Sequence, residues 1–325
     1  MTTRHRKKIL PLTVKQKPSL RAILILALAF LLPLPASAWN GAGHRLIAAI
    51  AWEQIDDNTR AAVIQLLQAH PDYLLWTANA KGDTPERAAF IEAATWPDDI
   101  RQDSRFYTPN EEDPTPLLPG FPDMQRHRDW HYVNRSLDRS DQPPISGQLA
   151  TQLDALAQTL SSPTSPLTER SYALPWLIHL VGDAHQPLHA STRRDPDNPQ
   201  SDLAIALIVS NPFNPRKSMT TLHAYWDDLP GPPWLRGTRL NKASKSLLVR
   251  YPKPAPSTPA QWLEESWQIA KDSAYPPENE TPPTISETFY ETSREIANRR
   301  ITEAGYRLAE LLQKLLSPQS VAGHN

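Results

Sequence analysis

The chain has 325 residues, of which 39% are hydrophobic and 21% charged, and its formal net charge is −1. This length is compatible with one large domain. The absence of cysteine excludes disulfides and thiolate metal sites. Any bound transition metal must therefore have only nitrogen and oxygen ligands, which are more typical of catalytic than of structural sites.

Residues 1–38 have the pattern of a secretory signal. Seven Lys and Arg side chains precede an apolar run at residues 22–34, and Ala36-Ser37-Ala38 follows it. This small-x-small sequence predicts cleavage before Trp39 and export to a periplasm or out of the cell. An uncleaved membrane anchor is the alternative, but the apolar run is shorter than the ~20 residues that span a bilayer and it ends in prolines.

Removal of this segment leaves 27 basic residues against 35 acidic ones, a net charge of about −8. An acidic protein does not bind polyphosphate through its overall charge, so metal ions or a local basic patch must supply that attraction. No later segment is apolar enough to span a bilayer. We therefore expect no stable membrane association after cleavage, and no obligate protein partner is evident.

Apolar residues recur at helical spacing through most of the remaining chain. We predict helices at residues 44–55, 56–70, 85–95, 147–161, 167–186, 259–273 and 284–316, with Pro97 and Pro187 ending two of them. We also expect Pro175 to interrupt the helix at 167–186 near its start. Residues 103–122 are predicted to form a surface loop, and residues 203–210 (LAIALIVS) a strand. The predicted fold is mainly α: a single compact multi-helix domain over residues 39–317, with a short β-hairpin excursion and a flexible tail at 318–325.

Two His/Asp pairs have a spacing of four residues on predicted helices. They are His179 with Asp183 and His223 with Asp227. Residues four apart share a helix face, so each pair can present an imidazole and a carboxylate to one ion. One such pair is weak support, because an ordinary surface hydrogen bond is the more frequent explanation.

The context of the first pair strengthens the metal interpretation. Its helix is strongly apolar, and His189 follows shortly after Pro187. A buried carboxylate and imidazole need compensation, which a metal ion supplies more completely than one hydrogen bond. Two further candidate ligands have similar surroundings. Asp98 follows Pro97, and His131 lies between aromatic residues in a β-like stretch. Taken alone, they are more often a capping carboxylate and a satisfied core histidine.

Five segments, in this order, resemble the zinc-dependent single-strand-specific nucleases of fungi and plants, often called nuclease S-one and P-one. They are WNGAGH at 39–44, WPDD at 96–99, WHYVN at 130–134, HLVGDAHQPLH at 179–189 and LHAYWD at 222–227. The resemblance covers essentially the whole predicted mature chain. It implies a phospholipase C/nuclease-like helical fold.

The resemblance further implies three Zn²⁺ ions. Trp39 would bind through its free α-amino group and carbonyl, and Asp183 would bridge the first two ions. The implied ligands are Trp39, His44 and Asp183 for the first ion, Asp183, Asp98, His131 and His179 for the second, and His189, His223 and Asp227 for the third.

The activity implied is hydrolysis of single-stranded DNA or RNA to 5′-phosphorylated products, together with 3′-nucleotidase action on 3′-nucleotides. Zinc with oxygen and nitrogen ligands keeps open positions for water and substrate. A water shared by the bridged ions would attack phosphorus, and Asp98 would orient it or accept its proton. The third ion would stabilise the departing 3′-oxygen.

Two regions depart from the usual pattern of the resembled family. Gln200-Ser201-Asp202 stands where relatives have Gly-Gly-Asn, which brings a carboxylate to a loop that seats the substrate. The base-binding aromatic and Asp of relatives correspond here to Tyr132 and Asn134. Tyr132 retains the ability to stack on a base, whereas Asn134 changes which base edges can be recognised.

Two other functions remain open. A zinc-dependent phospholipase C has a similar N-terminal Trp and HxxxD spacing, but it typically ends its ligand set with Glu, where this chain has Asp227. A noncatalytic exported zinc-binding protein is the alternative from another class. A site closed to further ligands would support that second alternative.

Overall fold

The computed structural model describes residues 39–78, 80, 82–138, 144–194, 202–277 and 279–317. All of them belong to one unit of the chain, Ala36–Asn325, which is separate from the unit Met1–Pro35. The predicted signal segment and tail, as well as Gln200 and Ser201, lie outside the described residues.

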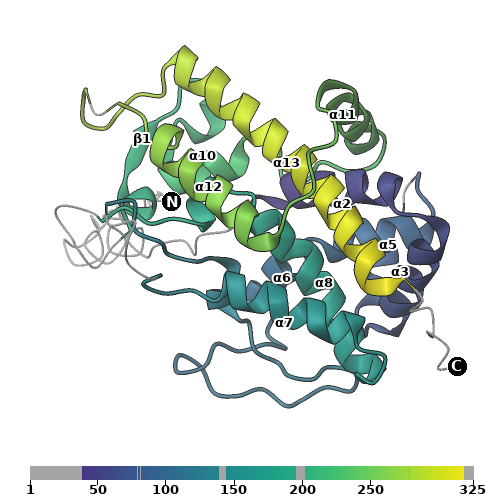
Figure 1. The fold of residues 1–325 in the computed structure, drawn as a ribbon. Coiled ribbons are helices and arrows are strands. Elements are labelled where there is room, and N and C mark those ends of the chain that lie inside the picture. Colours follow the sequence, from purple (N-terminus) through teal and green to yellow (C-terminus); the bar gives the residue numbers. More distant parts are fainter. Residues whose placement is uncertain are drawn as a thin grey trace, which may run out of the picture. The chain divides into compact units, whose positions relative to one another are not determined.

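Helices make up most of the described structure, and one two-stranded antiparallel hairpin accompanies them (Figure 1). This confirms the predicted mainly α fold with a short hairpin. The α-helices are α2 (Gly41–Gln54), α3 (Asp57–Ala69), α4 (Tyr73–Thr77), α5 (Pro85–Ala93), α6 (Trp96–Asp99), α7 (Leu149–Ser161), α8 (Leu167–Asp183), α9 (Leu203–Ala206), α10 (Leu222–Asp228), α11 (Gly237–Arg250), α12 (Pro259–Ser273) and α13 (Glu287–Leu316). The 3-10 turns are η1 (Ile100–Gln102), η2 (Arg128–His131), η3 (Pro187–His189) and η4 (Pro215–Lys217).

Helix α2 runs through the core. Every residue from Ala42 to Trp52 is buried, as expected for a helix that is apolar on nearly all sides. Helices α5, α8, α11 and α13 all pack against it. In Figure 1 the long yellow helix α13 crosses the purple helix α2. This contact is close because Gly305 of α13 faces Ile50, and a Cβ at position 305 would lie 2.4 Å from the Ile50 Cγ2 atom.

The prolines do not act as the sequence suggested. Pro175 lies in the middle of α8, and the helix continues through it because its second half is entirely buried in the core. Pro187 does not end α8, which stops at Asp183, but begins η3. Pro97 likewise lies in the first turn of α6, where a proline lacks no hydrogen bond that the helix needs.

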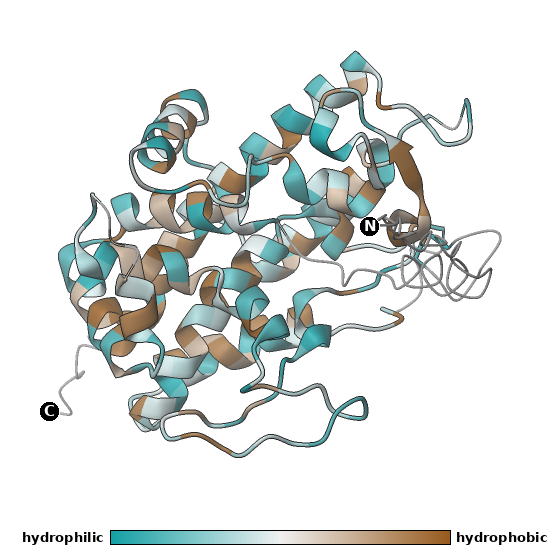
Figure 2. Cartoon of the chain, turned by 180° about the vertical axis from the view of Figure 1, so that it is seen from behind, coloured by the Kyte–Doolittle hydropathy of each residue, from teal (hydrophilic) through white to brown (hydrophobic). Residues whose placement is uncertain are grey.

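The strand predicted over residues 203–210 is only half correct. Its first half forms α9, whose N-terminus is capped by Asp202. Its second half is β1 (Ile208–Ser210), which pairs with β2 (Met219–Thr221) so that Val209 lies opposite Thr220. The arrow of this hairpin is among the most hydrophobic parts of the rear view (Figure 2).

Among the described residues, no helix has both the length and the apolar character that a membrane span requires.

Replacing Gly305 by Ala should destabilise the fold by about 1–3 kcal/mol, because the new methyl group overpacks the α2–α13 contact. Urea unfolding followed by circular dichroism measures this difference. Glu291→Ala, at an exposed position of the same helix, is the control and should change stability by less than about 0.5 kcal/mol. Equal stabilities of the two variants would contradict the close approach.

Candidate metal centre

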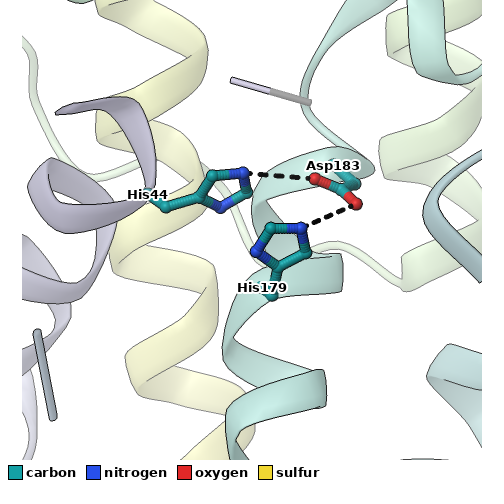
Figure 3. A group of neighbouring side chains, drawn as sticks. All are labelled: His44, His179 and Asp183. Atoms are coloured by element: carbon teal, nitrogen blue, oxygen red, sulfur yellow. Dashed lines mark ion pairs between the residues drawn. The ribbon is translucent and has the colours of Figure 1, made fainter. Parts of the chain in front are cut away.

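The first group of metal-ligating side chains lies where α2 meets the end of α8. The ring of His44 stacks on that of His179 with centroids 3.9 Å apart, and Gly182 leaves room for this approach. Figure 3 shows both rings facing Asp183. The His44 Nε2 atom is 3.4 Å from Asp183 Oδ1, and the His179 Nε2 atom is 3.4 Å from Asp183 Oδ2.

The second group adds Asp98 of α6 and His131 of η2. The His131 Nδ1 atom lies 3.1 Å from Asp183 Oδ2 and 3.0 Å from His179 Nε2. The Asp98 Oδ1 atom is 3.8 Å from His179 Nε2 and 4.0 Å from His131 Nδ1. The second group thus shares His179 with the first, and its His131 also approaches Asp183 of the first.

The conformation predicted around His131 is wrong. His131 ends a 3-10 turn, and the chain becomes extended only at Tyr132. His127 precedes this turn with a left-handed φ of 42°, and its ring stacks on that of Trp130 with centroids 3.7 Å apart. Alternation of apolar residues could not reveal a turn that such a ring contact accompanies.

The third group comprises His189 of η3 and His223 and Asp227 of α10. The Nε2 atoms of the two histidines are 3.0 Å apart, and His223 Nε2 is 3.7 Å from Asp227 Oδ2. The buried Gln186 donates a hydrogen bond of 2.8 Å from Nε2 to Asp227 Oδ1. Gln186 therefore orients the carboxylate through Oδ1, while Oδ2 is the oxygen near His223.

Trp39, the predicted first residue of the mature chain, is fully buried. The next backbone N–H, that of Asn40, donates to the carbonyl oxygen of Asp227 at 3.0 Å. The backbone next to Trp39 thus lies beside α10.

Two hydrogen bonds define the tautomers of His179 and His189. His179 Nδ1 is 2.8 Å from the Ala94 carbonyl oxygen, and His189 Nδ1 is 2.6 Å from that of His131. A carbonyl only accepts, so each Nδ1 carries the proton and each Nε2 presents a lone pair. This is the tautomer that ligates metals through Nε2.

Burial disfavours the charged forms of the carboxyls and imidazoles in this centre. It raises the pKa of the Asp183 and Asp227 carboxyls well above their usual range, and it lowers the pKa of His44 and His131 well below theirs. Both His44 nitrogens, His131 Nε2 and Asp183 Oδ1 are buried without a hydrogen-bond partner. A divalent cation with nitrogen and oxygen ligands fits these atoms, because it compensates carboxylates and neutral imidazoles together.

Three groups of potential ligand atoms result, each within 4.8 Å of one another: His44, His179 and Asp183; Asp98, His131 and His179; and His189, His223 and Asp227. The structure thus brings together all eight His and Asp residues that were predicted as ligands. The role of each as a ligand remains a prediction.

The two residues predicted to bind the base follow His131 directly. Tyr132 is partly buried, and Gly147 packs so closely that a Cβ at that position would lie 2.2 Å from the Tyr132 carbonyl oxygen. Asn134 donates from Nδ2 to Ser146 Oγ at 3.0 Å. Their contact with a substrate base remains a prediction.

Asp202 is the N-cap residue of α9, a role that the sequence analysis did not predict. Its Oδ1 atom accepts a hydrogen bond of 2.9 Å from the Ala204 N–H at the start of α9. Burial raises the pKa of this carboxyl to about 6. We infer that Asp202 affects the stability of the fold, whether or not its charge also repels a substrate phosphate.

Sequence reasoning missed two residues that hold predicted ligands. One is Gln186, although it lies inside the motif at 179–189. The other is Arg101, whose Nε atom lies 3.2 Å from Asp98 Oδ1. A basic residue one helical turn after the carboxylate was the available signal for Arg101.

A helical body with clustered, buried histidines and aspartates is compatible with the class of metal-dependent hydrolases. Residues 39–317 match the family model described as S1/P1 Nuclease. The chain therefore belongs to the S1/P1 nuclease family, as the sequence motifs predicted. It is accordingly a hydrolase that acts on phosphodiester bonds, and dependence on zinc is typical of this family.

Three similar proteins come from Arabidopsis thaliana. Endonuclease 4 is 25% identical over 305 residues, which cover 87% of this chain and 90% of the relative. Endonuclease 5 is 22% identical over 309 residues, covering 87% and 92%. Endonuclease 1 is 25% identical over 328 residues, covering 94% and 97%.

Asp202→Asn should gain stability relative to the unchanged protein as the pH rises from 4 to 7.5. The folded-state pKa of about 6 exceeds the unfolded value of about 3.9, so the unchanged protein loses stability as Asp202 ionises. Asn retains the capping acceptor without the charge. Urea unfolding at the two pH values measures the change.

Asp56→Asn is the matched control at the N-cap of α3. The hydrogen bond from the Thr59 N–H lowers the pKa of Asp56, so this variant should instead lose stability relative to the unchanged protein over the same pH interval. A common pH trend in both variants would contradict the assignment for Asp202.

Proposed function

We propose that this chain is a trinuclear-zinc endonuclease that hydrolyses single-stranded DNA or RNA to 5′-phosphorylated products, with 3′-nucleotidase activity on 3′-nucleotides. The observation that carries this proposal is the set of three adjoining His/Asp groups, two of which share His179. Membership in the S1/P1 nuclease family supports the same conclusion.

In this proposal Trp39 and His44 hold the first zinc, and Asp183 bridges it to the second. The position of Asp183 between three imidazoles supports a bridging role. The remaining ligands are Asp98, His131 and His179 for the second ion and His189, His223 and Asp227 for the third. When bound, zinc supplies Lewis acidity and lowers the pKa of water toward neutrality.

Asp98 is proposed to orient the attacking water and to accept its proton on a carboxylate oxygen. Its side chain is 16% exposed, whereas that of Asp183 is fully buried, so Asp98 has access to solvent and substrate. The Arg101 Nε atom restricts the orientation of this carboxylate. Tyr132 and Asn134 are proposed to contact the base next to the scissile phosphate.

A cavity of about 480 Å³ beside α10 offers a surface for a nucleic-acid substrate. Its lining includes the aromatic residues Phe213, Trp234 and Tyr290 and the cations Arg216, Lys217 and Arg294. Trp234 is 60% exposed. Exposed aromatic rings beside cations are typical of surfaces that bind single strands, and such a local patch does not require a basic protein overall.

Chelation should abolish phosphodiesterase activity and lower the thermal midpoint, and added zinc should restore both, because a metal bound only by the folded state adds to its stability. The assay compares denatured DNA, RNA, a 3′-nucleotide and a phosphatidylcholine analogue. We expect cleavage of the first three and no cleavage of the lipid.

Each other outcome has a clear meaning. Activity on the lipid alone would identify a phospholipase C. Zinc binding without turnover of any substrate would favour the noncatalytic zinc-binding protein. Full activity without metal would overturn the proposed mechanism.

We further propose that the chain is exported and cut after Ala38, so that Trp39 carries a free α-amino group. A peptide bond before Trp39 removes the basicity of this nitrogen and obstructs the metal. One additional residue before Trp39 should therefore remove one zinc per molecule and most of the activity while leaving the helix content intact. Metal analysis, activity and circular dichroism measure these quantities.

The control is the same chain released by a protease that leaves Trp39 first. Equal zinc content and equal turnover in the two forms would exclude ligation by the N-terminus.

A further inference from the structure

The turn after α8 connects the two parts of the metal centre. Asp183 belongs to the first group and His189 to the third, and only residues 184–188 separate them. Ala184, His185 and Gln186 in this turn are fully buried. The path of these three residues therefore determines the spacing between two groups of ligands.

Side chains from distant helices hold the carbonyls of this turn. Ser266 of α12 donates from Oγ to the Ala184 carbonyl oxygen at 2.7 Å. Arg300 of α13 donates from Nε to the His185 carbonyl oxygen at 3.4 Å and from one terminal nitrogen to Ser266 Oγ at 2.9 Å. These contacts satisfy carbonyls that the end of α8 leaves without helical partners.

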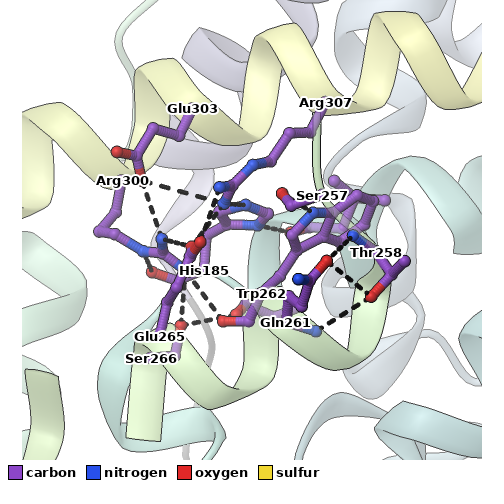
Figure 4. A network of polar contacts seen from close by, with 12 residues as sticks. His185, Ser257, Thr258, Gln261, Trp262, Glu265, Ser266, Arg300, Glu303 and Arg307 are labelled. Atoms are coloured by element: carbon purple, nitrogen blue, oxygen red, sulfur yellow. Dashed lines mark hydrogen bonds and ion pairs between the residues drawn. The ribbon is translucent and has the colours of Figure 1, made fainter. Parts of the chain in front are cut away.

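The His185 side chain joins the same network of polar contacts (Figure 4). Its Nδ1 atom donates to the Val181 carbonyl oxygen at 2.7 Å, so its Nε2 atom is an acceptor. That Nε2 atom accepts a hydrogen bond of 2.9 Å from a terminal nitrogen of Arg307. An always-charged guanidinium thereby holds His185 in one tautomer and one orientation.

Two buried arginines on one face of α13 are themselves fixed by a shared carboxylate. Arg300 and Arg307 approach Glu265 of α12 at 2.5 and 2.7 Å, and Arg300 also binds Glu303 at 2.8 Å. Their side chains are only 3% and 4% exposed. Figure 4 shows these residues bridging α12 and the yellow helix α13 around His185.

An ionic network whose guanidinium groups are buried is a weak source of stability, because desolvation offsets the attraction between the charges. It does impose a definite geometry. Here that geometry is imposed on the backbone between Asp183 and His189, and none of the network residues belongs to the three metal-ligating groups.

We propose that His185 and Arg307, supported by Arg300 and Ser266, are positioning residues that fix the turn so that Asp183 and His189 have the spacing needed for zinc. This inference rests on the proposed function, in which those two residues are zinc ligands. The residues act through the backbone and touch neither substrate nor metal.

The test measures zinc affinity and the thermal midpoint with and without zinc. His185→Leu removes the link to Arg307, and it should lower zinc affinity by about 10- to 100-fold, the usual effect of losing support for a metal ligand. The rise in thermal midpoint that zinc causes should shrink accordingly. In the metal-free state, His185→Leu should lower the thermal midpoint by less than it does in the zinc-bound state.

Arg299→Leu is the matched control, because Arg299 neighbours Arg300 but is exposed and pairs only with Glu295 among the described residues, at 3.6 Å. It should leave zinc affinity and both midpoints unchanged. His185→Gln places an acceptor near the position of Nε2 and should restore much of the zinc affinity. His185→Asn keeps the donor to Val181 but loses the acceptor for Arg307, and should not restore it.

The outcomes separate this inference from the proposed function. If the unchanged protein binds zinc and cleaves single strands, but His185→Leu or His185→Asn shows the same zinc affinity as His185→Gln, the positioning role is overturned. Equal losses of thermal midpoint with and without zinc would also overturn it, since they indicate a purely structural role. An unchanged protein that binds no zinc would overturn both proposals.

Discussion

The carboxylate of Asp183 lies within 3.4 Å of three imidazoles, which come from α2, η2 and α8. In the protein interior such a carboxylate is stable as an anion only when a positive charge compensates it. The surrounding histidines cannot supply that charge, because burial lowers the pKa of His44, His131 and His179. The centre of the molecule is therefore built around groups that a cation would compensate.

Close packing of the helices brings these side chains together. Gly182 lets the ring of His44 lie against α8, and Gly305 lets α13 lie against α2. The close approach of α13 in turn brings its two buried arginines to the turn after Asp183. The same long helix thus covers the core and supports the centre, and the apolar and ionic contacts of α13 are parts of one arrangement.

Local patterns were a good guide wherever local physics dominates. Helical spacing revealed α3, α7, α12 and α13, because each has an apolar stripe, and it revealed α2, which is apolar on nearly all sides. The same local patterns gave wrong predictions for the prolines and for part of the strand. Pro175 continues a helix that the core encloses, and the segment LAIALIVS divides between α9 and β1 because Asp202 caps its first half. In each case a tertiary or capping contact outweighed the intrinsic preference of the residues.

The sequence by itself determined that His179 and Asp183, and likewise His223 and Asp227, share a helix face, because a spacing of four residues does so in any α-helix. Its motifs also determined the family, and through the resemblance the set of expected ligands. Only the tertiary structure decided that α2, α6, η2 and α8 meet at one point, that Gln186 holds the Asp227 carboxylate, and that Arg307 holds His185. These contacts join residues that are far apart in the chain or point in directions set by packing, so no periodicity in the sequence records them.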